Sequence, residues 1–300
     1  MEESLPLHHY NMPFFFAYIF YIPLHIAGPT MTFNSFASQV LDEPTHIKPR
    51  FLVTYFLRFL FALAIMEFAT HYLYCYALTS SGAYKDFGPF YIGMLGYLAL
   101  HMVWLKFLII WRFFRLWALL DNIESTENMN RCMSDNYTIQ GFWRSWHRSF
   151  NRWNIRYIYV PLGGKKRNLL NTLVVFTFTA LWHDLTMKLL AWAWLMILFI
   201  LPETLAVYFF GRKELAGFRQ KWYYRYVCAF GGSLNIMLLM IANLVGFSAG
   251  TEGVSNYLSQ LITVDGVVFL SVAAFFLLVG VLIMFEVRDY EARNHIKKGY

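Results

Sequence analysis

The chain has 300 residues, of which 58% are hydrophobic, 20% are aromatic and only 14% are charged. Soluble domains average about 25% charged residues, and one soluble core cannot hide this much apolar surface, so a water-soluble protein is excluded. The net charge of +7 is carried by short basic clusters between apolar runs, which indicates contact with lipid head groups or phosphorylated substrates and disfavours nucleic acid as a partner.

Apolar runs follow one another along the chain. The first, about Met12–Ala27, contains Pro23 and is shorter than the roughly 20 residues that cross a bilayer, so we predict a re-entrant segment or the end of a helix. Longer runs predict membrane-spanning helices at Phe51–Leu78, Phe90–Leu120, Leu189–Phe210, Tyr226–Phe247 and Val267–Phe285, with Leu169–Met187 as a further candidate.

These runs predict an all-α fold. We expect a polytopic membrane helical bundle with six or seven spans plus re-entrant and interfacial helices. It would form a single transmembrane domain over residues 1–300, ending in a charged C-terminal tail at residues 286–300.

A basic, aromatic segment at residues 142–160 carries arginines at every fourth position, namely Arg144, Arg148, Arg152 and Arg156. On a helix this spacing makes one basic stripe, and we predict an interfacial helix. One interpretation, which composition favours, is an amphipathic helix that rests on anionic lipid. The other is a phosphate site, because the glycine-containing loop 161–164 before Lys165, Lys166 and Arg167 lets backbone N–H groups and cations approach a phosphate. Residues 144–167 carry many Arg and Lys residues and contain no Asp or Glu. This bias predicts that the segment faces the cytosol.

His183 is the best candidate for chemistry. It follows the apolar run 173–178, where an ionisable side chain is costly and indicates a functional site or an internal hydrogen-bond partner. A lone buried histidine is more often a satisfied packing residue, but its ordinary pKa near about 6.5 suits proton transfer from a hydroxyl at neutral pH. Asp184 adjoins it, yet neighbouring residues point to different faces of a helix, so we do not assume an Asp–His pair.

Other kinds of chemistry lack their motifs. The chain contains no GxSxG, HExxH, P-loop or GxGxxG motif. Its three cysteines, Cys75, Cys132 and Cys228, lie far apart without a CxxC spacing. We therefore expect no metal site, no bound cofactor and no disulfide framework.

Two motifs resemble those of the membrane-bound O-acyltransferase (MBOAT) family. One runs from Phe142-Trp143-Arg144-Ser145-Trp146-His147 into Tyr157-Ile158-Tyr159-Val160-Pro161-Leu162-Gly163-Gly164, and the other is Leu181-Trp182-His183, 36 residues beyond His147. The stretch Tyr21-Ile22-Pro23-Leu24-His25-Ile26-Ala27-Gly28-Pro29 is similar to the fungal glycerol-uptake-protein branch, which includes the hedgehog-acyltransferase-like proteins. Members of this branch carry more helices before that stretch, so we expect an N-terminally truncated sequence or a short form.

The resemblance implies transfer of a long-chain acyl group from acyl-CoA, as co-substrate, to a hydroxyl of a lipid acceptor. It gives His183 the role of general base and His147 the first polar position, which is Asn, Asp or His in the family. We expect the phosphates of acyl-CoA on Arg144, Arg148, Arg152, Lys165, Lys166 and Arg167, and a substrate path along Trp143, Trp146, Asn151 and Trp182.

For this branch the implied acceptor is lyso-GPI or another lysolipid, and the implied process is remodelling of GPI-anchor lipids in the endoplasmic reticulum membrane. Three other functions stay open. A glycerol or polyol transporter would be expected to show paired repeats with broken helices, and we find none in the sequence. A protein acyltransferase needs the same apolar tunnel and the same histidine. A non-catalytic membrane scaffold needs neither the tunnel nor the histidine for catalysis.

Overall fold

The computed structural model describes residues 4–41 and 47–296. Within them every regular element is helical, which confirms the all-α prediction. In chain order the α-helices are α1 (Met12–Ile19), α2 (Ile22–His25), α3 (Phe33–Leu41), α4 (Pro49–Tyr72), α5 (Cys75–Ser81), α6 (Pro89–Leu120), α7 (Ile139–Ser145), α8 (Arg148–Asn154), α9 (Asn168–His183), α10 (Met187–Phe210), α11 (Ala216–Arg219), α12 (Tyr224–Phe247), α13 (Gly250–Leu261) and α14 (Val264–Arg293). Shorter turns are η1 (Leu7–His9), η2 (Ala83–Asp86), η4 (Gly164–Arg167) and η5 (Lys213–Leu215), together with the π-helical turn η3 (Ile155–Tyr159).

Five helices in the described ranges are long and apolar enough to cross a membrane, by length and composition: α4, α6, α10, α12 and α14. This is fewer than the six or seven predicted. The first apolar run is divided between the short helices α1 and α2, because Pro23 lacks an N–H and fits only the first turn of a helix. The candidate at Leu169–Met187 is α9, which has 16 residues and ends at His183, where Asp184 is extended (φ −177°, ψ 154°).

The C-terminal charged segment is not a separate tail over its described part. α14 continues eight residues past the predicted end of the span and finishes at Arg293. Residues 297–300 of the predicted tail lie outside the described residues.

The chain divides into two compact units, each built from several stretches. The first comprises residues 1–73, 102–130 and 145–153, and the second comprises residues 74–101, 131–144 and 154–300. The single transmembrane domain expected over residues 1–300 stays a prediction.

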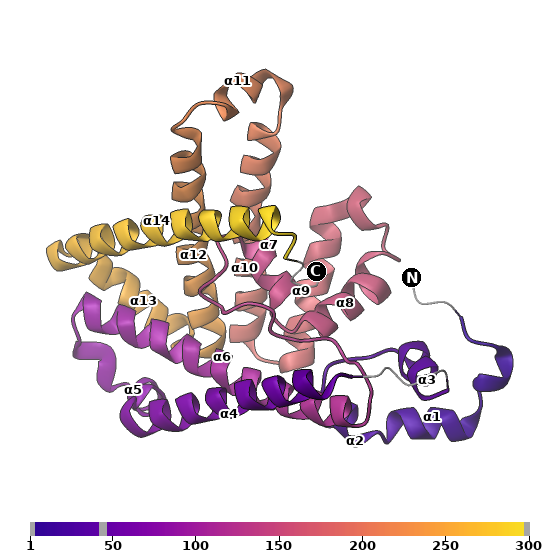
Figure 1. Ribbon diagram of the computed structural model, residues 1–300. Helices are drawn as coiled ribbons and strands as arrows, with labels where there is room; N and C mark the ends of the chain where they lie inside the picture. The colour runs from indigo at the N-terminus through magenta and orange to yellow at the C-terminus, as the bar shows by residue number, and fades with distance from the viewer. Residues whose placement is uncertain (1–3, 42–46, 297–300) are drawn as a thin grey trace. The chain divides into compact units, whose positions relative to one another are not determined.

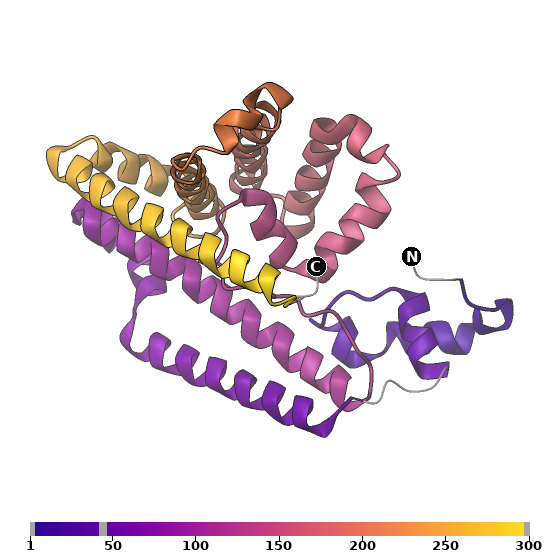
Figure 2. The same ribbon diagram turned by 45° about the horizontal axis from the view of Figure 1, so that its top comes forward.

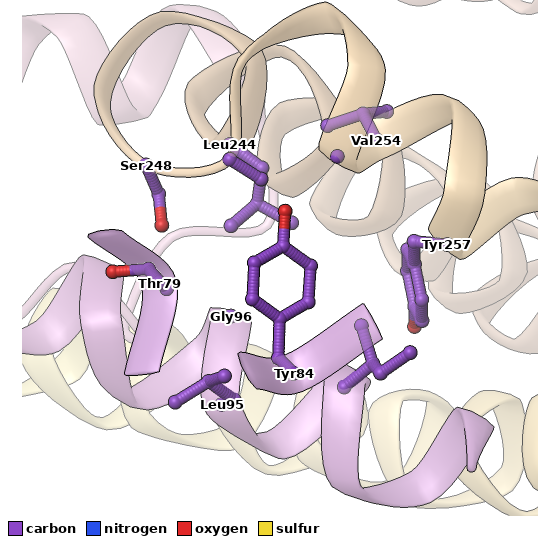
Figure 3. A pocket seen from close by; sticks show the side chains of 11 residues that line it. Thr79, Tyr84, Leu95, Gly96, Leu244, Ser248, Val254 and Tyr257 are labelled. Atoms are coloured by element: carbon purple, nitrogen blue, oxygen red, sulfur yellow. The ribbon is translucent and has the colours of Figure 1, made fainter. Parts of the chain in front are cut away.

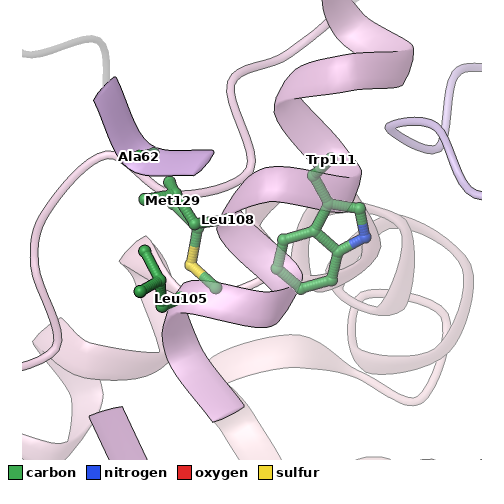
Figure 4. Close-up of a cluster of buried hydrophobic side chains, with 5 residues drawn as sticks. All are labelled: Ala62, Leu105, Leu108, Trp111 and Met129. Atoms are coloured by element: carbon green, nitrogen blue, oxygen red, sulfur yellow. The ribbon is translucent and has the colours of Figure 1, made fainter. Parts of the chain in front are cut away.

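In the first unit, α4 packs against the second half of α6. Ala62 of α4, three side chains of α6 including Trp111, and Met129 of the following loop form a buried apolar cluster (Figure 4). The loop after α6 is held by Arg115, which is buried and donates hydrogen bonds to the carbonyl of Ser125 at 2.8 Å and to Glu127 at 3.4 Å. These contacts satisfy a charge that would otherwise be costly among apolar helices.

In the second unit, α10 and α12 form an antiparallel hairpin joined by α11 (Figure 1). α9 packs against α10, and α14 lies across α12 (Figures 1 and 2). At that crossing a Cβ on Gly232 would lie 2.9 Å from Val281 Cγ1, closer than a methyl group allows. The missing side chain of Gly232 therefore lets α12 and α14 approach each other.

Candidate functional site

α9 begins behind a glycine turn. Gly163 and Gly164 have φ values of 102° and 55°, in the left-handed region that glycine adopts without strain. Asn171, 1% exposed, donates its amide N–H to the Gly164 carbonyl at 2.9 Å, and the Tyr159 hydroxyl donates to Asn168 Oδ1 at 2.9 Å. These hydrogen bonds fix the glycine-containing turn and the residues before it to the first residues of α9.

His183 is the last residue of α9, and it is exposed rather than buried as predicted. An apolar run preceding a residue indicates only that the run avoids water, and lipid serves that purpose as well as protein does. The Asp184 carboxylate accepts the N–H of Leu185 at 2.8 Å. Among the described residues no hydrogen bond involves the His183 imidazole.

Three aromatic rings surround the His183 imidazole. Their centroids lie 5.0 Å (Trp182), 5.7 Å (Phe247) and 6.1 Å (Trp192) from its own, all at steep angles. Although His183 as a whole is exposed, these rings exclude water from the imidazole on several sides. This desolvation lowers the pKa of His183 below its ordinary value, because it disfavours the charged form.

Trp192 is the centre of this aromatic cluster. It is fully buried, and its indole N–H donates to Asn243 Oδ1 at 3.1 Å. A Cβ on Gly246 would lie 2.8 Å from the Trp192 ring, so α12 leaves room for the indole at that position. The helices α10 and α12 thus fix the ring that supports His183.

Trp143 of α7 belongs to the same cluster. Its ring centroid lies 5.4 Å from that of Phe176 and 5.6 Å from that of Trp192, and its own indole N–H is buried without a partner. Glu203 of α10, 9% exposed, accepts the N–H of Ile139 at 2.7 Å and so satisfies the first turn of α7. Two predicted path residues, Trp143 and Trp182, are therefore brought to the aromatic cluster around His183.

His147, in the first unit, is a break between two helices. Its φ is +42°, and it separates α7 from α8. The single interfacial helix predicted over residues 142–160 is therefore wrong: a residue in the left-handed region interrupts the right-handed helical path. The imidazole stacks between Trp111 at 4.4 Å and Phe150 at 5.0 Å.

The polar residue Asn128, from the loop after α6, accepts the first N–H groups of α8. Its side-chain and backbone oxygens accept the N–H groups of Ser149 at 3.0 Å and Arg148 at 3.3 Å. The Ser149 hydroxyl in turn accepts the N–H of Thr30 at 2.8 Å. This contact joins the N-terminal Ala-Gly-Pro-Thr stretch to the helix that follows His147. The two bonded residues are 119 positions apart in the sequence.

The predicted basic stripe is not one surface. Arg148 is buried, whereas Arg144 and Arg152 are exposed and lie on different helices. Trp146 packs on Phe107 and Trp111 beside the apolar cluster of Figure 4, and Asn151 is half-buried on α8. The predicted site residues fall into two sets. His147, Arg148, Arg152, Trp146 and Asn151 belong to the first unit, and the others belong to the second.

Lys165, Lys166 and Arg167 form an exposed cluster at the beginning of α9. His183 is at the other end of the same helix, 16 residues long. At about 1.5 Å per residue the helix separates the cluster from the histidine by roughly 24 Å. A ligand that contacts both must be elongated.

A small pocket lies beside the C-terminal end of α12. Figure 3 shows the hydroxyl groups of Thr79, Tyr84, Ser248 and Tyr257 around it, among apolar and glycine positions. Burial raises the pKa of Tyr257. The space open to the centre of a water-sized sphere is about 20 Å³, enough for one water molecule. This pocket is too small for an acyl chain.

Sequence reasoning missed Trp192, Asn243 and Glu203. The signal for Asn243 and Glu203 was present, since a polar side chain inside an apolar span needs an internal partner. For Trp192 the signal was weaker. A buried indole usually finds a hydrogen-bond acceptor, but its partner is 51 residues away in sequence.

Comparisons with known proteins show the family to which the chain belongs. Residues 2–248 match the sequence profile of the membrane-bound O-acyltransferase family. The chain is 45% identical over 297 residues to membrane-bound O-acyltransferase GUP1 of Saccharomyces cerevisiae, covering 99% of this chain and 52% of that protein. The chain is 47% identical over 290 residues to the Schizosaccharomyces pombe protein of that name, and the match covers 96% of this chain and 49% of that protein. Mouse protein-cysteine N-palmitoyltransferase HHAT is 29% identical over 194 residues, covering 61% of this chain and 38% of that protein. The chain thus spans about half the length of its fungal relatives.

Proposed function

Because this chain belongs to the membrane-bound O-acyltransferase family, we propose that it transfers a long-chain acyl group from acyl-CoA to a hydroxyl of a lipid acceptor, with His183 as general base. The observation that supports this most is the state of the His183 imidazole. It is exposed and crowded by Trp182, Trp192 and Phe247, and no hydrogen bond in the described residues occupies its nitrogens. Such an imidazole is oriented and available to take a proton.

In the proposed reaction a neutral imidazole nitrogen takes the proton of the acceptor hydroxyl as the oxygen attacks the thioester carbonyl carbon. The carbonyl then re-forms as the carbon–sulfur bond breaks. The departing CoA thiolate takes the proton from the imidazolium, which restores the neutral base. No covalent enzyme intermediate and no redox partner are needed.

For the donor, we assign the phosphates of acyl-CoA to Lys165, Lys166 and Arg167. These cations are exposed, and the turn that carries them is fixed by Asn171. The roughly 24 Å between this cluster and His183 suits a donor whose phosphates and thioester are at opposite ends of a long arm. Arg144 is exposed at α7 and is the further candidate in this unit.

For the acceptor, our proposal is lyso-GPI or another lysolipid, with GPI-anchor remodelling in the endoplasmic reticulum as the process. The fungal relatives, which match nearly the whole chain, are named as O-acyltransferases, and this supports a hydroxyl acceptor. A protein acceptor is the second candidate, favoured by the similarity to a protein-cysteine N-palmitoyltransferase. It has less support, since that match is weaker and covers 61% of the chain.

The test is incubation of the purified, reconstituted protein with labelled acyl-CoA and microsomal lipid, followed by identification of the labelled product. His183→Ala should abolish transfer without changing insertion or abundance. The adjacent Asp184→Asn is the matched control and should retain activity, because Asp184 makes no hydrogen bond to His183.

Each other outcome favours a different function. Normal acylation by His183→Ala would refute the mechanism, and label on a peptide would select the protein acceptor. Acyl-CoA binding without turnover in the unaltered protein would select a scaffold. Glycerol flux into proteoliposomes that hold this protein alone would select a transporter.

A further inference from the structure

The tip of the α10–α12 hairpin is strongly basic. We call residues 211–225, which include α11, the α11 tip. It carries five basic side chains and one acidic side chain, Glu214, the basic ones being Arg212, Lys213, Arg219, Lys221 and Arg225. Figures 1 and 2 show α11 at the end of the hairpin, away from α9 and α13 of the same unit.

The α11 tip joins two helices that are candidate spans, and a step in charge marks where they leave the apolar layer. Arg225 is the last Asp, Glu, Lys or Arg on α12, and the helix continues to Phe247 without another. Arg225 pairs with Glu286 at 2.8 Å and Asp289 at 2.9 Å, where charged residues resume on α14 after the apolar stretch that follows Asp265. A charged residue at the end of a long apolar helix indicates the membrane–water interface.

Two of the five cations have internal roles. Arg219 donates hydrogen bonds to the carbonyls of Phe210 and Arg212, at the last turn of α10, and Arg225 is in the ion pairs with α14. Such contacts satisfy carbonyls that a helix end leaves without partners.

The other three basic side chains of the α11 tip are exposed. Lys213 and Lys221 are exposed, and their side chains make no hydrogen bond or ion pair in the described part of the chain. Arg212 is exposed and lies over the rings of Tyr208 at 5.1 Å and Phe209 at 5.6 Å, which leaves its charge in place. Glu214, the single acid of the α11 tip, forms no ion pair with them in the described residues.

Large aromatic rings lie among these cations. Trp222 is 79% exposed, and its ring contacts those of Tyr223 at 5.8 Å and Tyr226 at 5.9 Å. A ring so exposed in water would cost free energy, whereas tryptophan and tyrosine are favoured at the level of lipid head groups, where one end of the ring is apolar and the other is hydrated.

We propose that the α11 tip binds the head groups of anionic phospholipids, with Arg212, Lys213 and Lys221 as the contacts and Trp222 inserted at head-group level. Clustered cations beside a membrane span attract anionic lipid, and the attraction weakens with salt. The proposal concerns a surface that takes no part in the proposed acyl transfer.

Quenching of Trp222 fluorescence tests this directly. The protein is reconstituted in phosphatidylcholine vesicles that hold the same minor fraction of either brominated phosphatidylserine or brominated phosphatidylcholine. The chain has 10 tryptophans, so the signal of Trp222 is the difference between the unaltered protein and Trp222→Phe. We expect the brominated phosphatidylserine to quench this signal more, and the difference to shrink at high salt.

Charge removal at the tip should abolish that preference. The variant is R212Q/K213Q/K221Q, and the matched control is K165Q/K166Q/R167Q, which removes three positive charges elsewhere in the same unit and should keep it. Equal quenching by the two lipids in the unaltered protein would overturn the proposal. Quenching by neither lipid would also overturn it and would indicate that the tip faces water or an acidic protein. If the tip variant fails to fold, the effect of salt on quenching in the unaltered protein still tests the proposal.

Discussion

Trp192 and Asn243 lie 51 residues apart in sequence, yet the indole N–H of one donates to the amide oxygen of the other at 3.1 Å inside the second unit. This bond fixes a fully buried ring that contacts both His183 and Trp143. The orientation of the candidate base therefore depends on a contact between α10 and α12 rather than on any hydrogen bond to the base itself.

Asn243→Leu should reduce both stability and acyl transfer, because it leaves the Trp192 N–H buried without an acceptor. Such a group costs about 1–3 kcal/mol. Adding Trp192→Phe to the same chain removes the orphaned donor and should recover part of the stability but not the transfer rate. Thermal unfolding and initial rates of the two single variants and the double variant measure this. If the loss of stability in the double variant equals the sum of the losses in the two single variants, Trp192 and Asn243 are not coupled.

Substitutions at His147 should separate a backbone role from a side-chain role. The residue has φ +42°, which an alanine adopts at a cost of about 1–2 kcal/mol and glycine or asparagine adopt more readily. We expect His147→Gly and His147→Asn to be at least as stable as His147→Ala, and His147→Gly to be impaired in acyl transfer. Unfolding midpoints and rates at matched folded concentration decide it. Full activity of His147→Gly would show that the imidazole does no chemistry.

The pH dependence of transfer should follow His183. The rings around the imidazole lower its pKa from the ordinary value near about 6.5, so the neutral base is already present at pH 7. We expect kcat/KM to fall on acidification as the imidazole takes a proton, with a half-maximal point below the ordinary value of about 6.5. Asp184→Asn should leave the profile unchanged. A half-maximal point well above 6.5 would argue against His183 as the base.

Two ion pairs that tie α14 to the rest of the second unit should differ sharply in strength. Arg131 and Glu291 are 2.6 Å apart with side chains 2% and 11% exposed, whereas Arg225 and Glu286 are 40% and 68% exposed. Removal of Arg131 leaves Glu291 with Arg288 at 3.9 Å. Loss of one partner of a buried pair costs about 3–5 kcal/mol, while an exposed pair contributes less than about 1 kcal/mol. Thermal unfolding of Arg131→Gln and Arg225→Gln compares them, and similar shifts would contradict this ranking.

Sequence patterns located the long apolar helices well. α6, α10 and α12 begin within two residues of the predicted spans and end at the predicted residues, because the length and polarity of a span are properties of the local sequence. The same patterns failed for His183. An apolar run does not reveal whether lipid or protein covers it, so the residue was predicted to be buried and is exposed.

The break at His147 could not be predicted from local rules. No glycine or proline marks it, and four arginines at regular spacing indicated one continuous helix. What fixes the break is long-range: Trp111 stacks on the imidazole, and Asn128 accepts the first N–H groups of α8. The pairing of Trp192 with Asn243 is equally remote in sequence. Such contacts follow from the fold and not from the motif that the fold carries.

On the proposed function, the short, fixed length of α9 has a consequence for which donors the protein accepts. Asn171 binds the Gly164 carbonyl, and Asn168 accepts the hydroxyl of Tyr159 before the turn. Lys165, Lys166 and Arg167 therefore move together with the helix that ends in His183. On the proposed mechanism, any tilt of α9 shifts the phosphate contacts and the reacting nitrogen as one body. A thioester on a carrier with a shorter arm would then reach one end or the other but not both, and selection among donors would rest on their length rather than on their chemical identity.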